Sequence, residues 1–465
     1  MRKHIQKLLL VLLTMPFALT SCMEDSEERV YSDKCYISSF ALGGLTRRNY
    51  TKTSQGEDSI FTTTFSGSAF TMTIDQRNLT IENLDSLPIR TRLDKVTTSA
   101  AFEGAMVWRK VNYENLEDTM WHSYNSSDSL DLTEPIHLCV VAENLVSKRI
   151  YTLKINVHQQ VGDSTTWDNL GPVSALSGLQ ARKVVAWNGQ LVVLGVNESG
   201  AVTCVQHALG TQGEWSAKST TGAENADVES LQQIGDRLYL STTDGKVIES
   251  TNATDWTPAS FPTLAGLRLV AASDGYLYAL AGGQLYSSNG ETWDVEQLDD
   301  DASLLPTMQV NSAYYYMANG RPRLMLFGAR TASDKQTTIW AKSWEQGLET
   351  QTKWIYYTPN EADKYRLPMM ENLCVVPYDN GLQALGGRSM DGRFAALETI
   401  LHSRDHGITW KTYENDDMVV DSHLGDAART ARYIVAAVDE DNFLWVLVDE
   451  QVWRGRINRL GFKRD

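Results

Sequence analysis

The segment Ser403 to Trp410, Ser-Arg-Asp-His-Gly-Ile-Thr-Trp, constrains the fold more than any other part of the chain, because imperfect copies of it recur upstream. Residues 287–293 form a copy that is one residue shorter and has Asn289 in place of the aspartate. Residues 250–256 form another copy of this shorter length, which has no glycine. The pattern predicts a β-hairpin in which the glycine takes a positive-φ turn position and an acceptor side chain caps the turn. We expect each tryptophan to pack between neighbouring sheets. The copies therefore predict an array of similar sheets.

The spacing of the repeat tryptophans supports this array. They fall at positions 215, 256, 293, 354 and 410, in steps of 41, 37, 61 and 56 residues, and steps near 40 suit four-stranded propeller blades. A turn followed by a short apolar strand recurs six times, at 188–193, 235–240, 274–279, 323–326, 380–385 and 442–447. The repeats thus contain six such strands but five tryptophans.

The missing outer strand is expected before the array, at residues 164–168 around Trp167. Pairing of this segment with residues 452–457 would close the ring and leave no long unpaired edge. We therefore predict an all-β chain whose residues 160–465 form a six-bladed β-propeller. Five or seven blades, or another all-β fold, are the alternatives.

The copy at 403–410 matches at every defined position the Asp-box, or BNR repeat, of bacterial neuraminidase-type propellers, Ser-x-Asp-x-Gly-x-Thr-Trp, and the chain resembles that family. The resemblance implies structural rather than catalytic roles for the residues of the boxes. These are Ser403, Asp405, Gly407, Thr409, Trp410, Ser287, Asn289, Gly290, Thr292, Trp293 and Trp256.

The N-terminus has the pattern of an export signal. Residues 8–19 form an apolar run that is too short to span a bilayer, after a basic start. Residues 19–22, Leu-Thr-Ser-Cys, resemble the bacterial lipobox, which implies a signal peptide over 1–21 and lipidation of Cys22. An ordinary signal peptide is the alternative. The resemblance implies a lipid anchor in the outer membrane or at the cell surface.

The net charge of the chain limits the classes of molecule that it could bind. Removal of residues 1–21 would leave 39 basic and 58 acidic residues, and an acidic surface argues against nucleic acid as a partner. Residues 22–32 form an acidic tether that resembles the export tag of Bacteroidetes surface lipoproteins, although a solvated linker has the same composition.

Residues 33–158 carry a different pattern. Residues 34–42, 136–143 and 149–157 are predicted strands, and the last alternates apolar with polar side chains. The closing strand resembles those of bacterial immunoglobulin-like or cadherin-like β-sandwiches, which implies a stalk or a docking surface. The whole chain resembles two-domain surface lipoproteins of the Bacteroidetes, a likeness that implies the layout but no activity.

The cysteines and histidines indicate neither a metal nor a cofactor. Cys35 and Cys139 are candidates for a disulfide, whereas Cys204 and Cys374 are expected as buried thiols. The chain has no CxxC or HExxH motif, so no zinc site is predicted. His402 and His406 have a spacing that suits metal binding on a helix, not on a hairpin.

A possible ligand site lies on the later loops. Residues 365–368, Tyr-Arg-Leu-Pro, resemble the sialidase motif whose arginine holds a carboxylate, but sialidases carry that motif ahead of their Asp-boxes. The candidate ligand-binding residues are Tyr365, Arg366, Arg330, Arg388 and Arg393, accompanied by Lys335 and Asp391. They would form a pocket for an anionic glycan, or else a set of solvated charges. A catalytic Tyr–Glu pair is not identifiable among Glu361, Glu371 and Tyr378.

Three functions remain open. The leading hypothesis is a non-catalytic surface lipoprotein whose propeller binds a glycan or a surface protein. The second is a sialidase-like glycoside hydrolase or a lyase acting on extracellular glycans, which predicts two convergent carboxylates about 5 to 10 Å apart. The third is a structural subunit of an outer-membrane assembly.

Overall fold

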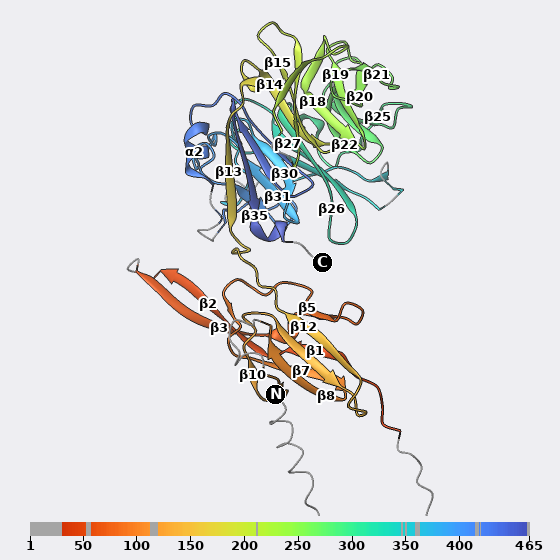
Figure 1. Ribbon diagram of the computed structural model, residues 1–465. Helices are drawn as coiled ribbons and strands as arrows, with labels where there is room; N and C mark the ends of the chain where they lie inside the picture. Colours follow the sequence, from red (N-terminus) through yellow and green to blue (C-terminus); the bar gives the residue numbers. More distant parts are fainter. Residues whose placement is uncertain are drawn as a thin grey trace, which may run out of the picture. The chain divides into compact units, whose positions relative to one another are not determined.

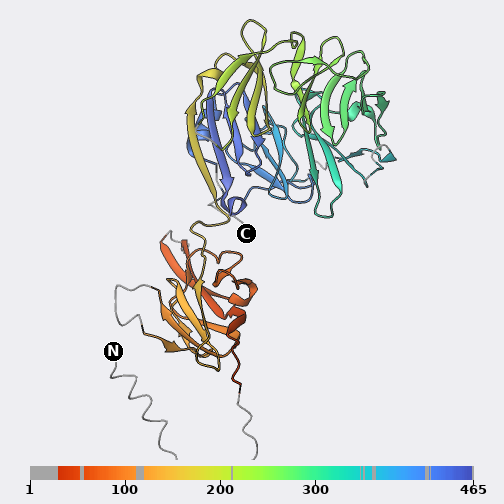
Figure 2. The same ribbon diagram turned by 45° about the vertical axis from the view of Figure 1, so that its right-hand side comes forward.

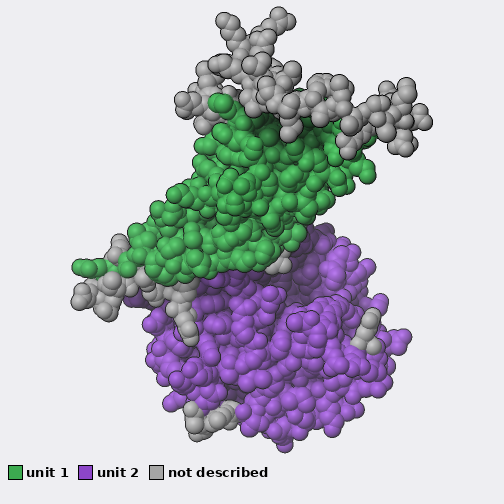
Figure 3. Space-filling view, turned by 90° about the horizontal axis from the view of Figure 1, so that it is seen from below, with its two compact units in different colours: residues 1–159, 464–465 green, residues 160–463 purple. Residues whose placement is uncertain are grey.

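A computed structural model describes residues 30–52, 57–111, 120–210, 213–345, 347–348, 351–358, 363–413, 418 and 420–462. The chain divides into two compact units, with the boundary after Gln159 (Figure 3). The predicted signal peptide, Cys22 and most of the tether lie outside the described residues. Among the helices that are described, none is long and apolar enough to cross a membrane.

The first unit is β-rich (Figure 1). Its three sheets have the orders β1-β7-β10, β4-β5-β12-β11-β8-β9 and β3-β2-β6, and β5 pairs with β12 in parallel. The strands are β1 Tyr36–Leu42, β2 Gly44–Lys52, β3 Asp58–Ser66, β4 Met72–Asp75, β5 Thr80–Asn83, β6 Thr91–Arg92, β7 Val96–Glu103, β8 Ala105–Lys110, β9 His122–Ser123, β10 Ser129–Leu130, β11 Ile136–Val141 and β12 Lys148–Lys154. A short 3-10 turn, Gly67–Ala69, follows β3. The strands expected at 34–42, 136–143 and 149–157 are thus present as β1, β11 and β12.

Each sheet of the second unit is antiparallel, and together they form a β-propeller (Figures 1 and 2). The sheets are β14 to β17, β18 to β21, β22 to β25, β26 to β29, β30 to β32, and β33 to β35 joined by β13. Their innermost strands β14, β18, β22, β26, β30 and β33 contact one another in a closed ring. The described residues therefore contain six sheets around one axis, in agreement with the number of strand repeats in the sequence.

The bounds of the first three sheets and the joining strand are β13 Thr165–Pro172, β14 Gln180–Trp187, β15 Gln190–Val196, β16 Val202–Ala208, β17 Ser216–Ser219, β18 Ala226–Ile234, β19 Arg237–Thr242, β20 Val247–Ser250, β21 Thr257–Pro258, β22 Arg268–Ser273, β23 Tyr276–Ala281, β24 Gln284–Ser288 and β25 Asp294–Val295. The others are β26 Met308–Tyr316, β27 Pro322–Ala329, β28 Thr338–Ser343, β29 Ile355–Tyr356, β30 Cys374–Tyr378, β31 Gly381–Leu385, β32 Leu401–Ser403, β33 Ile434–Val438, β34 Leu444–Val448 and β35 Gln451–Ile457. The described residues of this unit also include one helix, α2 Ser422–Ala428, and the 3-10 turns Ser174–Leu176, Ala302–Leu304 and Asn458–Gly461.

The ring is closed by strands from its two ends, as predicted. β13 pairs antiparallel with β35, from Thr165 opposite Ile457 to Pro172 opposite Gln451. Arg454 on β35 forms an ion pair of 2.8 Å with Asp168 on β13. The side chain of Asn458 accepts a hydrogen bond from Thr166 Oγ1 at 2.7 Å and donates one to the Val161 carbonyl at 3.0 Å. The first strand of the unit thereby becomes the outer strand of its last sheet.

The turn at Ser403–Trp410 has the geometry expected of it. Asp405 Oδ1 accepts hydrogen bonds from Thr409 N at 2.8 Å and Ser403 Oγ at 2.9 Å, and Gly407 has φ +88°. The indole of Trp410 donates to the Gly407 carbonyl at 3.1 Å and packs edge-on against Phe327 of the preceding sheet. Trp410, only 3% exposed, therefore joins the two sheets.

The imperfect copies reach a similar turn with different residues. In the copy without glycine, Ala253 takes the left-handed position at φ 65°, and Asn252 Oδ1 accepts hydrogen bonds from Thr254 N and Asp255 N at 2.9 and 2.8 Å. Trp256 donates to the Ala253 carbonyl at 3.3 Å and is buried. Asn252 therefore caps this turn as the side-chain acceptor, although the copy has no glycine.

The four described cysteines, Cys35, Cys139, Cys204 and Cys374, are buried free thiols. This agrees with the expectation for Cys204 and Cys374. For Cys35 and Cys139, the structure shows no disulfide.

We expect Asp405→Ala to lower the free energy of unfolding of the propeller by about 1–2 kcal/mol, because it removes the acceptor of three hydrogen bonds. Burial raises the pKa of Asp405, but hydrogen bonds from Thr409 and Ser403 outweigh it, and the net pKa is lowered. The stability that ionised Asp405 contributes should therefore be lost as the pH falls below about 4. Denaturant unfolding at pH 7 and at pH 3, with exposed Asp236→Ala as the control, measures this. An equal loss in both variants at pH 7 would contradict the capping role.

A second prediction concerns ring closure. A Cβ at Gly455 would lie 2.5 Å from the ring of Trp167, so Gly455→Val should separate β13 from β35. Hydrogen exchange should then show loss of amide protection over residues 165–172, with little change in β18 to β21. Gly44→Val is the control, because no atom lies within 4 Å of its Cβ. Unchanged protection of β13 in Gly455→Val would refute the closure.

Candidate ligand-binding sites

The five arginine and tyrosine residues predicted to bind a ligand lie on loops at one end of two adjacent sheets. These loops join β27 to β28, β29 to β30, and β31 to β32. Backbone hydrogen bonds hold them together, from Met369 N to the Lys335 carbonyl at 3.0 Å and from Met390 N to the Met369 carbonyl at 2.7 Å. These contacts bring the three loops together at one end of the two sheets.

Arg330, Arg388 and Arg393 each have a carboxylate partner within these loops. Arg330 lies 3.8 Å from Asp334, Arg388 lies 3.0 Å from Glu371, and Arg393 lies 2.6 Å from Asp391. Arg393 also donates to the carbonyls of residues 364 and 366, at 2.7 and 3.0 Å, and so shapes the loop. A carboxylate ligand would have to compete with carboxylates already present.

Arg366 lines a cavity of about 370 Å³ with Gln336, Tyr357 and Asp363. Gln336 Oε1 is buried there without a hydrogen-bond partner among the described residues. The neighbouring Tyr365 ring is contacted by the ammonium groups of two lysines, 364 and 411, at 4.7 and 5.1 Å from its centroid. An anionic-glycan site centred on Tyr365 and Arg366 stays a prediction.

The remaining catalytic candidates do not converge on Arg366. The hydroxyl of Tyr378 donates to the Asn442 carbonyl at 3.0 Å and accepts from Ile457 N at 3.1 Å, which is a structural role. Glu371 is the partner of Arg388. Glu361 lies outside the described residues. His406 Nδ1 lies 3.0 Å from the hydroxyl of Tyr315, and no group of three or more metal-ligating side chains occurs in the described part of the chain.

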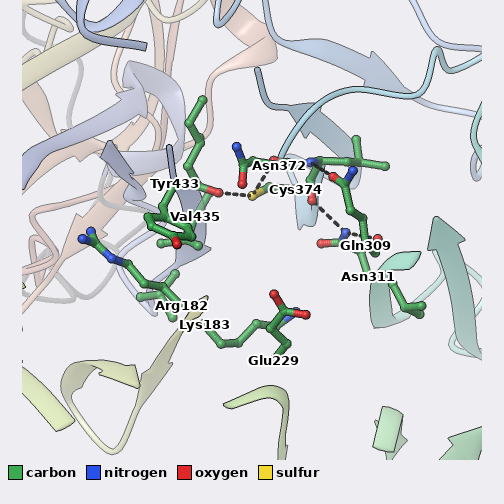
Figure 4. A pocket seen from close by; sticks show the side chains of 14 residues that line it. Arg182, Lys183, Glu229, Gln309, Asn311, Asn372, Cys374, Tyr433 and Val435 are labelled. Atoms are coloured by element: carbon green, nitrogen blue, oxygen red, sulfur yellow. Dashed lines mark hydrogen bonds between the residues drawn. The ribbon is translucent and has the colours of Figure 1, made fainter. Parts of the chain in front are cut away.

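A second cavity, of about 140 Å³, lies where the inner strands β14, β26, β30 and β33 begin (Figure 4). Lys183 and Glu229 extend toward each other inside it, and Cys374 donates at 3.5 Å to the carbonyls of Asn372 and Ile434. Burial lowers the pKa of Lys183. We call this space the channel cavity.

A third cavity, of about 370 Å³, lies at the far end of β26, between that sheet and the one that begins with β22. We call it the aromatic pocket. Its lining includes Asp274, Tyr314, Tyr316, Arg321, Trp344 and Glu345. These residues come from the β22–β23 turn, the β26–β27 hairpin and the segment after β28, which the propeller brings together.

The aromatic rings of this pocket are fixed in place. Tyr314 and Trp344 are stacked, with centroids 6.2 Å apart and an interplanar angle of 12°, and Tyr314 meets Tyr316 edge-on. Trp344 is 5% exposed, whereas Tyr316 is 59% exposed. Tyr316 is therefore a largely exposed ring held against the partly buried Tyr314, which in turn packs on the buried Trp344.

Polar groups surround that ring. The hydroxyls of Tyr314 and Tyr316 both donate to Asp274 Oδ2, the first at 2.9 Å. None of the hydrogen bonds found among the described residues ends on Asp274 Oδ1, which leaves this oxygen for a ligand. Burial, followed by hydrogen bonding to Tyr316 and Asp274, raises the pKa of Tyr314, so its hydroxyl stays a donor. Arg321 and Glu345 form an ion pair of 2.5 Å on the rim.

A buried ion pair supports the wall between the two sheets. Lys342 and Glu296 lie 2.5 Å apart, with side chains 1% and 5% exposed, and Trp354 donates to Glu296 at 2.8 Å. Lys342 also lies over the ring of Tyr278, 5.7 Å from its centroid. Removal of one charge would leave the other buried and unpaired.

The sequence pattern did not single out the aromatic pocket. Trp344 is not one of the tryptophans that mark the repeat, and it lies ten residues before the repeat tryptophan Trp354. The available signal was the run Tyr314-Tyr315-Tyr316 before a turn. Successive side chains of a strand point to opposite faces of the sheet, so these three rings cannot all face the same side.

The fold and the cavities define a β-propeller that follows a β-rich N-terminal unit. The chain belongs to the DUF6242 family. The DUF6242 beta propeller domain matches residues 161–465, and the N-terminal domain described as Domain of unknown function (DUF6242) matches residues 40–155. No curated protein matches the chain.

Solved structures with similar propellers have low identity to this chain. YCF48 bound to D1 peptide is 14% identical, with a TM-score of 0.34 over 61% of this chain and 78% of the other. A six-bladed fungal lectin of Aleuria aurantia, described with a fucose recognition mode, is 12% identical, with a TM-score of 0.35 over 58% and 89%. The Trypanosoma rangeli sialidase in complex with the inhibitor DANA is 10% identical, with a TM-score of 0.35 over 60% and 55%. At these scores the likenesses carry no argument about a ligand.

We expect Glu296→Gln to destabilise the propeller by about 3 kcal/mol or more, because it leaves the Lys342 ammonium buried without its counter-charge. Glu345→Gln, which breaks the exposed ion pair to Arg321, should cost less than about 1 kcal/mol. Denaturant unfolding of the two variants side by side measures the difference. Similar small losses in both would show that the buried pair does not hold the sheets together.

Proposed function

We propose that this protein is a lipid-anchored surface protein whose propeller binds glycans at the aromatic pocket without cleaving them. The observation that supports it most is the exposed Tyr316 beside Asp274, whose Oδ1 accepts none of the hydrogen bonds found among the described residues. Sugar rings pair one apolar face of C–H groups with hydroxyls at the edge. An aromatic platform next to a carboxylate acceptor matches both features.

The charge of the pocket indicates which sugars fit. Asp274 and Glu345 carry two negative charges, and Arg321 supplies one positive charge that Glu345 already holds. The excess negative charge disfavours a sialic or uronic acid and favours a neutral sugar or an amino sugar. This ligand class differs from the anionic glycan that the arginine-rich loops suggested.

The layout of the chain suits a surface receptor. Lipidation at Cys22 would tether the protein to the outer membrane, and residues 22–32 would serve as the acidic tether. The β-rich unit over residues 33–158 would act as an immunoglobulin-like stalk, and the Asp-box turns would brace the propeller over 160–465. These assignments are parts of the proposal, as is the likeness to Bacteroidetes surface lipoproteins.

Hydrolysis is the alternative with a specific observation in its favour, because two carboxylates, Asp274 and Glu345, line one pocket. Glu345, however, is already held by Arg321 at 2.5 Å, so a glycosidic oxygen would have to displace this ion pair to reach it. Incubation of the protein with each sugar that it binds, followed by detection of reducing ends, distinguishes binding from cleavage.

A glycan array tests the proposal. A soluble form that begins at Met23 should bind neutral or amino-sugar glycans, and Tyr316→Ala should weaken binding by about 10-fold or more, since it removes the platform. Asp274→Asn should weaken it similarly by replacing the carboxylate acceptor.

Arg366→Ala is the control at the other candidate site and should bind like the unaltered protein. Loss of binding in Arg366→Ala, with Tyr316→Ala unaffected, would move the site to the loops and overturn the proposal. Circular dichroism of each variant establishes that the fold is kept.

A further inference from the structure

The channel cavity contains a lysine with no direct counter-charge. Lys183 lies on β14, one of the inner strands that form the closed ring, and lines the cavity. It makes none of the ion pairs found among the described residues. The two carboxylates that act electrostatically on Lys183, those of Asp227 and Glu229 on β18, are both held by Arg268, each at 2.8 Å. The charge of Lys183 is therefore not neutralised by contact.

The other polar groups of the cavity are already committed. Arg182 donates to the carbonyls of Leu176 and Leu179, both at 2.9 Å, and also to that of Asp449. Burial raises the pKa of the Cys374 thiol to about 11, so the thiol is neutral near pH 7. Lys183 is thus the cation that a ligand in this cavity would meet.

The strand pairing around the cavity is irregular. The pairing of β14 with β15 shifts between Gln180 and Lys183, and that of β26 with β27 shifts between Met308 and Asn311. Such bulges redirect side chains and occur often beside functional sites.

Three non-glycine residues at these strand entries have left-handed backbone conformations, which a surrounding structure must hold in place. They are Ala181 at φ 45°, Gln309 at φ 49° and Asn372 at φ 49°. Gln309 and Asn372 line the cavity. Unfavourable conformations of this kind gather at ligand sites, which is an observation independent of the charge of Lys183.

We propose that the channel cavity binds a small monocarboxylate, whose oxygens contact the Lys183 ammonium. The cavity of about 140 Å³ is large enough for a ligand of a few heavy atoms, not for an oligosaccharide. This site is separate from the aromatic pocket. The eight residues of β26 from Gln309 to Tyr316 span roughly 23 Å between the two sites.

A monocarboxylate fits better than a phosphate. Lys183 supplies one positive charge, and Asp227 and Glu229 stand close enough to affect its pKa. A doubly charged anion would be repelled by these carboxylates, whereas a single charge is matched by the lysine. Burial, the main cause of the lowered pKa of Lys183, would be offset by an anion that stabilises the charged amine.

Calorimetric titration of the soluble protein from Met23 with acetate, propionate and inorganic phosphate, at constant ionic strength, tests this. We expect acetate or propionate to bind with one site per chain and phosphate to bind at least about 10-fold more weakly. Lys183→Met, which removes the charge but keeps the length, should weaken carboxylate binding at least about 10-fold. Lys183→Arg should restore part of it.

Lys246→Met is the matched control, because Lys246 is an exposed lysine that pairs with Asp244 outside the cavity, and it should bind like the unaltered protein. Three results would overturn the proposal: no binding of either carboxylate, equal binding by Lys183→Met, or tighter binding of phosphate. Tyr316→Ala should leave carboxylate binding unchanged, so the outcome does not depend on the glycan site.

Discussion

The pairing of β13 with β35 is the interaction on which the propeller depends. It joins residues almost 300 positions apart in the sequence and turns an open row of sheets into a ring. Without it, the last sheet would keep an unpaired edge and β14 would lose its fixed place beside β33. The ion pair between Arg454 and Asp168 and the buried side chain of Asn458 lie on this seam. These polar contacts form in a strand register that places the Trp167 ring over Gly455, where the missing side chain leaves room for the ring.

Closure of the ring also determines where ligands can bind. Strand β26 runs from the channel cavity to a hairpin at its other end, so it contributes Asn311 to one site and Tyr316 to the other. The aromatic pocket needs two adjacent sheets in register, and the buried pair of Lys342 and Glu296 connects them. The chemistry of the two sites differs because the first contains an unneutralised ammonium group and the second an unused carboxylate oxygen.

The repeating part of the fold was predictable from the sequence, because each turn follows local rules. The cap at Asp405 and the glycine at 407 are fixed by backbone geometry within eight residues, and the closing strand followed from a count of strands. Ala253 shows the limit of this reasoning, since it adopts the left-handed conformation that the pattern reserves for glycine. Tertiary packing, with Trp256 buried beside it, replaces the local preference there.

The candidate sites were less predictable because their residues come from separate segments. The sequence indicated a group of arginines on neighbouring loops, which is where the structure places them. It did not show that Asp334, Asp391 and Glu371 would neutralise three of them. The aromatic pocket was missed because Asp274 and Tyr316 are 42 residues apart and meet only through the packing of two sheets. Lys183 was missed because a single lysine in an apolar strand has no motif.

A crystal structure of the protein soaked with the sugar that it binds best tests glycan binding at the aromatic pocket most directly. We expect density for the sugar ring against Tyr316, with a hydroxyl or amino group within hydrogen-bond distance of Asp274 Oδ1. Density beside Arg366 and Tyr365, with the aromatic pocket empty at saturating sugar, would contradict it.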